Sequence, residues 1–327
     1  MKKLIIHMGA HRCGSTAVQS MLRREQAQLR ENGIKVLLRA DMVAGGLDLR
    51  RLHKYHSVNP IWQSKLKRAV LAVDETNAHT LLASEENLMG TMPAVRSKGF
   101  YPHFRRLVSG LARLSSMVDG KAIIAPRLVI RRQDRYLESV YAFRISRGLN
   151  QDFDSFIRNV TKAPVSWLKL AQSLAKLPAS VQPKIALLEA WPKPTAGDQA
   201  LAFLIGENDL NLQTKRLTGN TRHSETALRL MLALNKAKIE WQSADWKQDV
   251  FDLVDIYQDE PEADLIFALK DRIPKRHYAR FSQLYSPQAK LFFDDEQRQA
   301  FLDGVTESNA ELMAMDMVVS EPETWNG

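Results

Sequence analysis

The sequence has little cysteine and no long apolar run. One cysteine in 327 residues excludes an internal disulfide and a cysteine-cluster metal site. Such sparse use of cysteine fits a reducing compartment best. No stretch approaches the roughly 18 continuous apolar residues of a membrane-spanning helix, so we expect no transmembrane segment. Internal repeats and low-complexity tracts are also absent.

The N-terminal sequence MKKLIIHMGAHR lacks the small-residue cleavage site of a signal peptide. Two lysines precede a short apolar run, but His7 interrupts that run, and His11 and Arg12 follow it. We therefore interpret the run as a buried strand and expect a cytoplasmic protein.

The composition is that of a soluble globular chain, with 45% hydrophobic and 25% charged residues. The net charge of +9 is unevenly spread. Residues 101–150 hold ten Lys/Arg against three Asp/Glu, a net of +7, and residues 251–327 hold seven against sixteen, a net of −9. The basic middle segment indicates either an anionic ligand or simply a solvated basic face.

Short β-type runs alternate with helical patterns, which predicts an α/β fold with a parallel sheet flanked by helices. The expected strands are Lys3–Met8, Ile34–Leu38, Thr80–Ser84, Leu128–Arg131 and Lys184–Glu189. The expected helices are Thr16–Arg30, Lys65–Val73, Arg135–Arg147, Asp198–Leu204 and Glu225–Ala237. After about residue 240 the pattern is helical only. We thus expect a domain over residues 1–240, with 241–327 as a helical extension packed on it.

Residues 4–16, LIIHMGAHRCGST, have the pattern of a phosphate-binding loop between a strand and a helix. Glycines let the backbone approach a phosphate, and N–H groups at the helix start point at it. The spacing nearly fits a Walker A loop, but Ser15 stands where the lysine belongs. That lysine reaches the β- and γ-phosphates in triphosphate enzymes, so its absence argues against a kinase.

The run His11-Arg12-Cys13-Gly14-Ser15-Thr16 resembles the 5′-phosphosulfate loop of sulfotransferases that use 3′-phosphoadenosine-5′-phosphosulfate (PAPS), and it is similar to that of bacterial members with a P-loop-type fold. Most members have a lysine where this chain has Arg12. Arginine keeps the charge but does not readily release a proton, so the resemblance makes Arg12 an electrostatic stabiliser. We interpret Cys13 as a small loop residue rather than a reactive thiol.

Residues 127–141, RLVIRRQDRYLESVY, resemble the family's 3′-phosphate motif. Arg131 and Ser139 match in register, and a strand-end guanidinium and a helix hydroxyl can converge on one phosphate. Arg132 and Gln133 depart from the usual acid-or-amide and proline pair.

Members of this family use a Glu or His to deprotonate the acceptor. Ser84-x-Glu86 matches a strand end that many members share, so Glu86 is the preferred base, with Glu85 as the alternative. An acidic helix start that only caps is an equally good interpretation. His53 and His56 are weaker candidates, for catalysis or for a metal.

The resemblance implies transfer of a sulfuryl group from PAPS to a hydroxyl or amine of a small-molecule, lipid or glycan acceptor. It requires no metal. Arg12 and Glu86 would be catalytic, and His11–Thr16 with Arg131 and Ser139 would bind the nucleotide. The alternatives are a P-loop nucleotide-binding protein of the kinase type and a non-catalytic anion- or glycan-binding protein. Nucleic acid is disfavoured because residues 101–150 are not enriched in aromatics.

Overall fold

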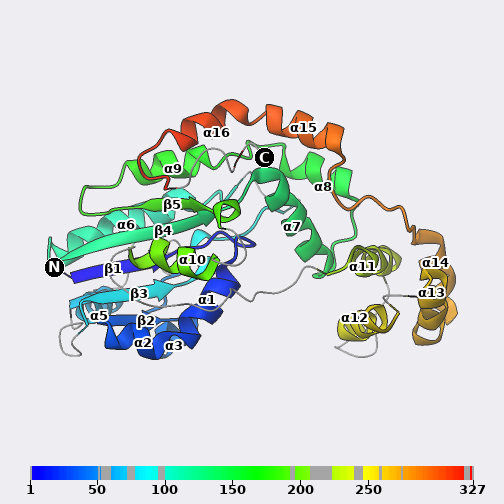
Figure 1. Cartoon of the computed structure of the whole chain (residues 1–327), viewed down its shortest axis with the longest axis horizontal. Coiled ribbons are helices and arrows are strands. Elements are labelled where there is room, and N and C mark those ends of the chain that lie inside the picture. Colours follow the sequence, from blue (N-terminus) through cyan, green and yellow to red (C-terminus); the bar gives the residue numbers. More distant parts are fainter. Residues whose placement is uncertain are drawn as a thin grey trace.

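The computed structural model describes residues 2–50, 52, 60–71, 78–94, 100–191, 196–206, 223–238, 246–257, 260–273, 275–319 and 325. A five-stranded sheet lies at its centre (Figure 1). The strands are β1 (Lys2–His7), β2 (Ile34–Leu37), β3 (Thr80–Ser84), β4 (Ala122–Ile130) and β5 (Lys184–Leu187). All are parallel, in the order β2-β3-β1-β4-β5. The predicted α/β fold with a parallel sheet is thereby confirmed.

Helices cover both faces of the sheet because both faces of its strands are apolar. Ile5 of β1 packs with the helices of one face, whereas Leu4 and Ile6 belong to the core on the other. The first face holds α1 (Ser15–Arg24), α2 (Gln26–Glu31) and α10 (Ala196–Ile205). The second holds α5 (Pro60–Leu71), α6 (Phe104–Val118), α7 (Gln133–Ile145), α8 (Phe153–Val160) and α9 (Leu168–Ala175). The short α3 (Arg39–Ala44) packs beside β2 and β3.

From residue 223 onward the described part of the chain is mostly helical, in line with the predicted helical C-terminal part. It comprises α11 (Glu225–Ala237), α12 (Trp246–Ile256), α13 (Glu262–Arg272), α14 (Lys275–Leu284), α15 (Asp295–Asp303) and α16 (Thr306–Met313). Helices α11 to α14 gather at one side, and α15 and α16 run back over α8 and α9 (Figure 1). Beyond α16, Val318 forms a parallel bridge with Ile185 of β5. The boundary near residue 240 stays a prediction.

Three predicted elements are wrong in extent. The expected helix Lys65–Val73 already begins at Pro60, as α5. The expected helix Thr16–Arg30 is two helices, with a break at Glu25 between α1 and α2. The expected strand Leu128–Arg131 is only the end of β4, which begins at Ala122. Pro126 and Arg127 interrupt the apolar run in the sequence, yet both lie inside this strand.

Candidate functional site

The phosphate-type loop lies at the carboxyl end of β1, the central strand. The chain reaches β2 and β3 on one side of β1 and β4 and β5 on the other, so β1 marks the switch point where ligands of such sheets bind. Two N–H groups hold the loop's start on β4, from Met8 to the Arg127 carbonyl at 2.9 Å and from Ala10 to the Val129 carbonyl at 3.3 Å.

Gly14 gives the loop its turn into α1. Its φ of 80° lies in the left-handed region, and it caps the helix that starts at Ser15. The first helical hydrogen bond is donated by Val18 to the Gly14 carbonyl at 3.0 Å. The preceding N–H groups of the first turn are therefore not used in the helix ladder, and an anion can accept from them.

Arg12 has a backbone conformation that is costly for a residue with a side chain. Its φ is 65°, and such a conformation costs on the order of 1–3 kcal/mol. The side chain is held in place nearby: its Nε donates to Ser139 Oγ at 3.2 Å, and the guanidinium lies 5.4 Å from the Phe143 ring centre. The strained turn thus aims the Arg12 cation at α7, towards the second predicted phosphate segment.

Both predicted phosphate segments line one cavity of about 350 Å³. The loop contributes His11, Arg12, Gly14, Ser15 and Thr16 from one side, and Arg131 and Ser139 come from the end of β4 and from α7. Glu86, from the segment after β3, completes the set. Three chain segments far apart in the sequence thus bring the predicted residues together, apart from Cys13, which is buried.

Arg131 is fixed before any ligand arrives. Its Nε donates to Glu189 Oε1 at 3.2 Å, and its carbonyl accepts from the Trp167 indole at 2.7 Å. Glu189 also accepts the N–H of Arg132 at 3.2 Å. Because the pair with Glu189 uses Nε, it leaves the terminal guanidinium nitrogens of Arg131 for an anion in the cavity.

The residues that depart from the family motif have structural partners instead. Arg132 is buried and pairs with Asp134 at 2.8 Å. The amide of Gln133, also buried, donates to Asn309 Oδ1 of α16 at 2.6 Å. The turn before α7 is therefore built to dock the C-terminal helices, which gives the departures a physical reason.

The two candidate carboxylates after β3 face different surroundings. Glu85 is 2% exposed and accepts from the N–H of Asn87 at 3.1 Å and from its side-chain amide at 3.0 Å. Glu86 instead lines the cavity and accepts the hydroxyl hydrogen of Ser15. Of the two, only Glu86 lines the cavity, whereas Glu85 caps the short 3-10 turn Glu86–Met89.

A directional chain of hydrogen bonds holds His11. Tyr101 Oη accepts from Tyr136 Oη at 3.0 Å and from the His11 N–H at 2.9 Å, so it gives its own hydrogen to His11 Nδ1 at 3.2 Å. His11 Nε2 then carries the ring proton and donates to Asn87 Oδ1 at 3.3 Å. Burial lowers the pKa of His11, against the hydrogen bond to Asn87 and the nearby charge of Glu86. The imidazole is thus neutral, and it positions the loop rather than taking up a proton.

Burial also determines the protonation state of the Cys13 thiol. The side chain is fully buried, and this desolvation raises the pKa of the thiol well above its usual range. A thiol held protonated is a poor nucleophile, which favours the interpretation as a packing residue. His53 and His56, the other candidate bases, lie outside the described residues.

Several cavity residues were not among the predicted site residues. Arg135 and Phe143, on the same face of α7 as Ser139, line the same cavity, and so does Glu138. Helical spacing could have identified Arg135 and Phe143, because residues four positions before and after Ser139 lie on the same face of the helix. The roles of Asn87 and Tyr101 had no such signal, since they act through His11.

None of the helices in the described ranges combines the length and the apolarity that crossing a membrane requires. Within those ranges no three His, Cys, Asp or Glu side chains cluster as a metal ion would need. Comparison of the chain with protein-family models, with curated proteins and with solved structures finds no match.

Proposed function

We propose that this protein is a sulfotransferase that moves a sulfuryl group from PAPS to a hydroxyl or amine of an acceptor. One observation carries the proposal. A glycine-containing loop without a Walker lysine shares its cavity with Arg131 and Ser139, which come from a separate segment. Such a cavity offers anion-binding groups at two places, as a nucleotide with both a 5′-phosphosulfate and a 3′-phosphate requires.

The residues divide between the two ends of this nucleotide. The first N–H groups of α1, that of Ser15 among them, and the hydroxyl of Thr16 would hold the 5′-phosphosulfate, and Arg12 would face the oxygen that bridges phosphorus and sulfur. Arg131 and Ser139 would hold the 3′-phosphate. The hydrogen bond between Arg12 and Ser139 makes the two anion-binding groups neighbours in the cavity.

The reaction then breaks the bond between sulfur and the bridging oxygen and forms one between sulfur and the acceptor oxygen or nitrogen. The electron pair of the broken bond stays on the 5′-phosphate, where Arg12 stabilises it. Glu86 takes the proton that the acceptor loses. The hydroxyl of Ser15 orients the Glu86 carboxylate for this role.

Calorimetric titration with 3′-phosphoadenosine-5′-phosphate tests the binding half of the proposal, with ATP plus Mg²⁺ as the comparison. We expect binding of the bisphosphate without metal and much weaker binding of ATP. Binding of ATP alone would instead support a kinase-type protein, and binding of neither nucleotide would refute the proposal.

The chemical half is tested with labelled PAPS and a panel of phenols, alcohols and amines. Glu86→Gln should keep the affinity for the bisphosphate and lower the turnover by about 10²- to 10⁴-fold, the usual contribution of a general base. Bisphosphate binding without any turnover by the wild-type chain would identify a non-catalytic binding protein. Full turnover by the variant would remove Glu86 from the mechanism.

A further inference from the structure

The cavity that Arg131 and Ser139 line also has a carboxylate, Glu138, on its wall. We call this cavity of about 350 Å³ the phosphate cavity. The side chain of Glu138 is 9% exposed, and the residue directly precedes Ser139 in α7. An unbalanced negative charge at this place would repel any anion that the neighbouring side chains bind.

Arg298 of α15 balances this charge. Its Nη2 donates to Glu138 Oε1 at 2.8 Å, and its Nη1 donates to Asp134. The two carboxylates are four positions apart in α7, so they lie on one face of the helix and repel each other. Since both terminal nitrogens of Arg298 are used, this guanidinium is committed to the two carboxylates. In the sequence it lies 160 positions from Glu138.

Arg132 completes the group of charges. It donates to Asp134 from Nε at 2.8 Å and from Nη2 at 3.0 Å. Burial alone would raise the pKa of Asp134, but the hydrogen bonds that it accepts, first of all from Arg132, lower that pKa, so the carboxylate stays ionised. The two arginines and the two carboxylates thus form a cluster without net charge, which we call the α7–α15 charge cluster.

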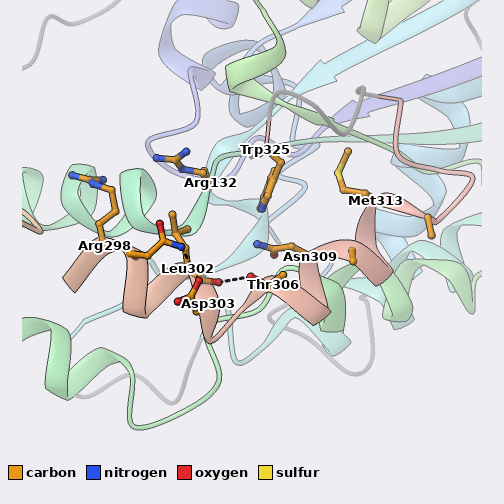
Figure 2. A pocket seen from close by; sticks show the side chains of 11 residues that line it. Arg132, Arg298, Leu302, Asp303, Thr306, Asn309, Met313 and Trp325 are labelled. Carbon is orange, nitrogen blue, oxygen red and sulfur yellow. Dashed lines mark hydrogen bonds between the residues drawn. The ribbon is translucent and has the colours of Figure 1, made fainter. Parts of the chain in front are cut away.

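The α7–α15 charge cluster lies between two cavities. Arg132 and Arg298 line a second cavity of about 660 Å³ beside α15 and α16 (Figure 2). Of the four cluster residues, Glu138 alone lines the phosphate cavity. The phosphate cavity is therefore in contact with an acidic member of the cluster, and the cation that offsets its charge comes from the other side of the wall.

We propose that Arg298 determines how tightly the phosphate cavity binds anions, by offsetting the charge of Glu138. Arg298 is a positioning residue that acts through Glu138 and not by touching the ligand. It holds Oε1, which also accepts the N–H of Phe293 at 3.2 Å. The identity of the anion rests on the proposed sulfuryl transfer, whereas the dependence on Arg298 applies to any anion in this cavity.

Calorimetry with 3′-phosphoadenosine-5′-phosphate and with inorganic pyrophosphate tests this assignment on the full chain. Arg298→Gln should weaken the binding of both anions about tenfold, because each then meets an uncompensated carboxylate. Arg298→Lys, which keeps the charge, should recover most of this loss. Arg229→Gln is the matched control and should change neither affinity. Arg229 also pairs with a carboxylate, that of Glu225, and is 22% exposed, but it does not line the phosphate cavity.

Glu138→Gln separates the effect of charge from that of packing. The single variant should bind both anions severalfold more tightly than the wild type, because it removes a negative charge from the wall. Combined with Arg298→Gln, it should return both affinities close to those of the wild type, since the cluster is then neutral again. A purely structural role of Arg298 predicts neither result.

Unchanged or weaker binding in Glu138→Gln would overturn the proposal, and so would a double variant as weak as Arg298→Gln. Binding of pyrophosphate without binding of the nucleotide would refute the proposed sulfuryl transfer but leave these comparisons valid. Binding of neither anion by the wild type would overturn both proposals.

Discussion

At the scale of single residues, Arg131 is held by two partners at the edge of the cavity that the loop His11–Thr16 lines. Glu189 and Trp167 fix its side chain and its carbonyl, so a ligand does not have to order it. Preorganised donors bind anions more tightly because less side-chain entropy is lost on binding. The single substitution Arg131→Ala should therefore report directly on the bound phosphate.

Arg131→Ala should weaken the binding of 3′-phosphoadenosine-5′-phosphate by about 10- to 100-fold, the range expected for loss of a charged hydrogen bond. Adenosine 5′-phosphate, which lacks the 3′-phosphate, should be affected far less. Calorimetry on both nucleotides measures the difference, and Arg106→Ala, an exposed position on α6, is the control. Equal losses for the two nucleotides would show that Arg131 does not contact the 3′-phosphate.

His7 lies beneath the phosphate loop as a fully buried, uncharged histidine. Its Nδ1 is 2.8 Å from Ser84 Oγ, and its Nε2 has no hydrogen-bond partner in the described part of the chain. Burial lowers its pKa from 6.5 to about 4. A Cβ on Gly9 would come within 3.0 Å of Nε2, so the loop backbone passes directly over the imidazole.

The lowered pKa of His7 predicts a loss of stability in weak acid. Between pH 6.5 and about 4 the unfolded chain binds a proton at this residue and the folded chain does not. The free energy of unfolding should therefore decrease as the pH is lowered through this window, by up to about 3 kcal/mol from His7 alone. Denaturant titrations at neutral pH and at about pH 5 measure this decrease in the free energy of unfolding.

His7→Asn provides the comparison, because an amide can keep the bond to Ser84 but does not titrate. Its free energy of unfolding should depend less on pH across this window than that of the wild type. The same pH dependence in both proteins would assign the effect to other groups.

At the scale of elements, α6 shows how close packing can override helix propensity. Gly110 lies in the middle of this helix, where glycine costs up to about 1 kcal/mol relative to alanine. A Cβ at this position would lie 2.6 Å from the carbonyl oxygen of Leu52 and 3.1 Å from its Cβ. The glycine is thus explained by the backbone of Leu52, which leaves no room for a side chain at this position.

Gly110→Ala should destabilise the protein by about 1–3 kcal/mol, although alanine is the better helix former. Ser116→Ala, at an exposed position on the same helix, should change the stability by less than about 0.5 kcal/mol. Thermal and urea unfolding of the two variants measure the contrast. A more stable Gly110→Ala variant would mean that Leu52 moves away at no cost.

The elements that the sequence predicted best are those whose pattern is local. Strand β3 and helix α11 have the bounds that their apolar patterns predict. The start of β4 was missed because Arg127 is polar and yet buried, where it donates to the carbonyls of Pro126 and Gln182. Because Gln182 lies 55 positions away, no local pattern reveals it as a partner.

The candidate site likewise contains residues that the sequence identified and residues that only the structure identified. Short motifs and their resemblance to a family singled out the loop His11–Thr16 and the pair Arg131 and Ser139, and these segments line one cavity. The choice between Glu85 and Glu86 needed the structure, since neighbouring carboxylates after a strand differ only in what folds around them. The partner of Gln133 on α16, 176 positions away, was likewise beyond any sequence pattern.

At the scale of the whole molecule, the buried pair of Gln133 and Asn309 ties α16 to the start of α7. Alanine at either position should lower the free energy of unfolding by about 1–3 kcal/mol, because the remaining amide is left buried without its partner. The double variant should lose less than the sum of the two single losses. Urea unfolding of all four proteins measures this coupling, and strictly additive losses would show that the two amides do not depend on each other.

The bridge between Val318 and Ile185 has a consequence for protein synthesis. The N–H of Ile185 donates to the Met317 carbonyl at 2.8 Å, and the N–H of Val319 donates to the Ile185 carbonyl at 2.9 Å. The edge of β5 is therefore protected by residues that leave the ribosome more than a hundred positions after it. At about 5–20 residues per second, a nascent chain exposes this unpaired edge for several seconds or longer. During that interval a chaperone, or the matching edge of a neighbouring nascent chain, competes with Met317–Val319 for β5.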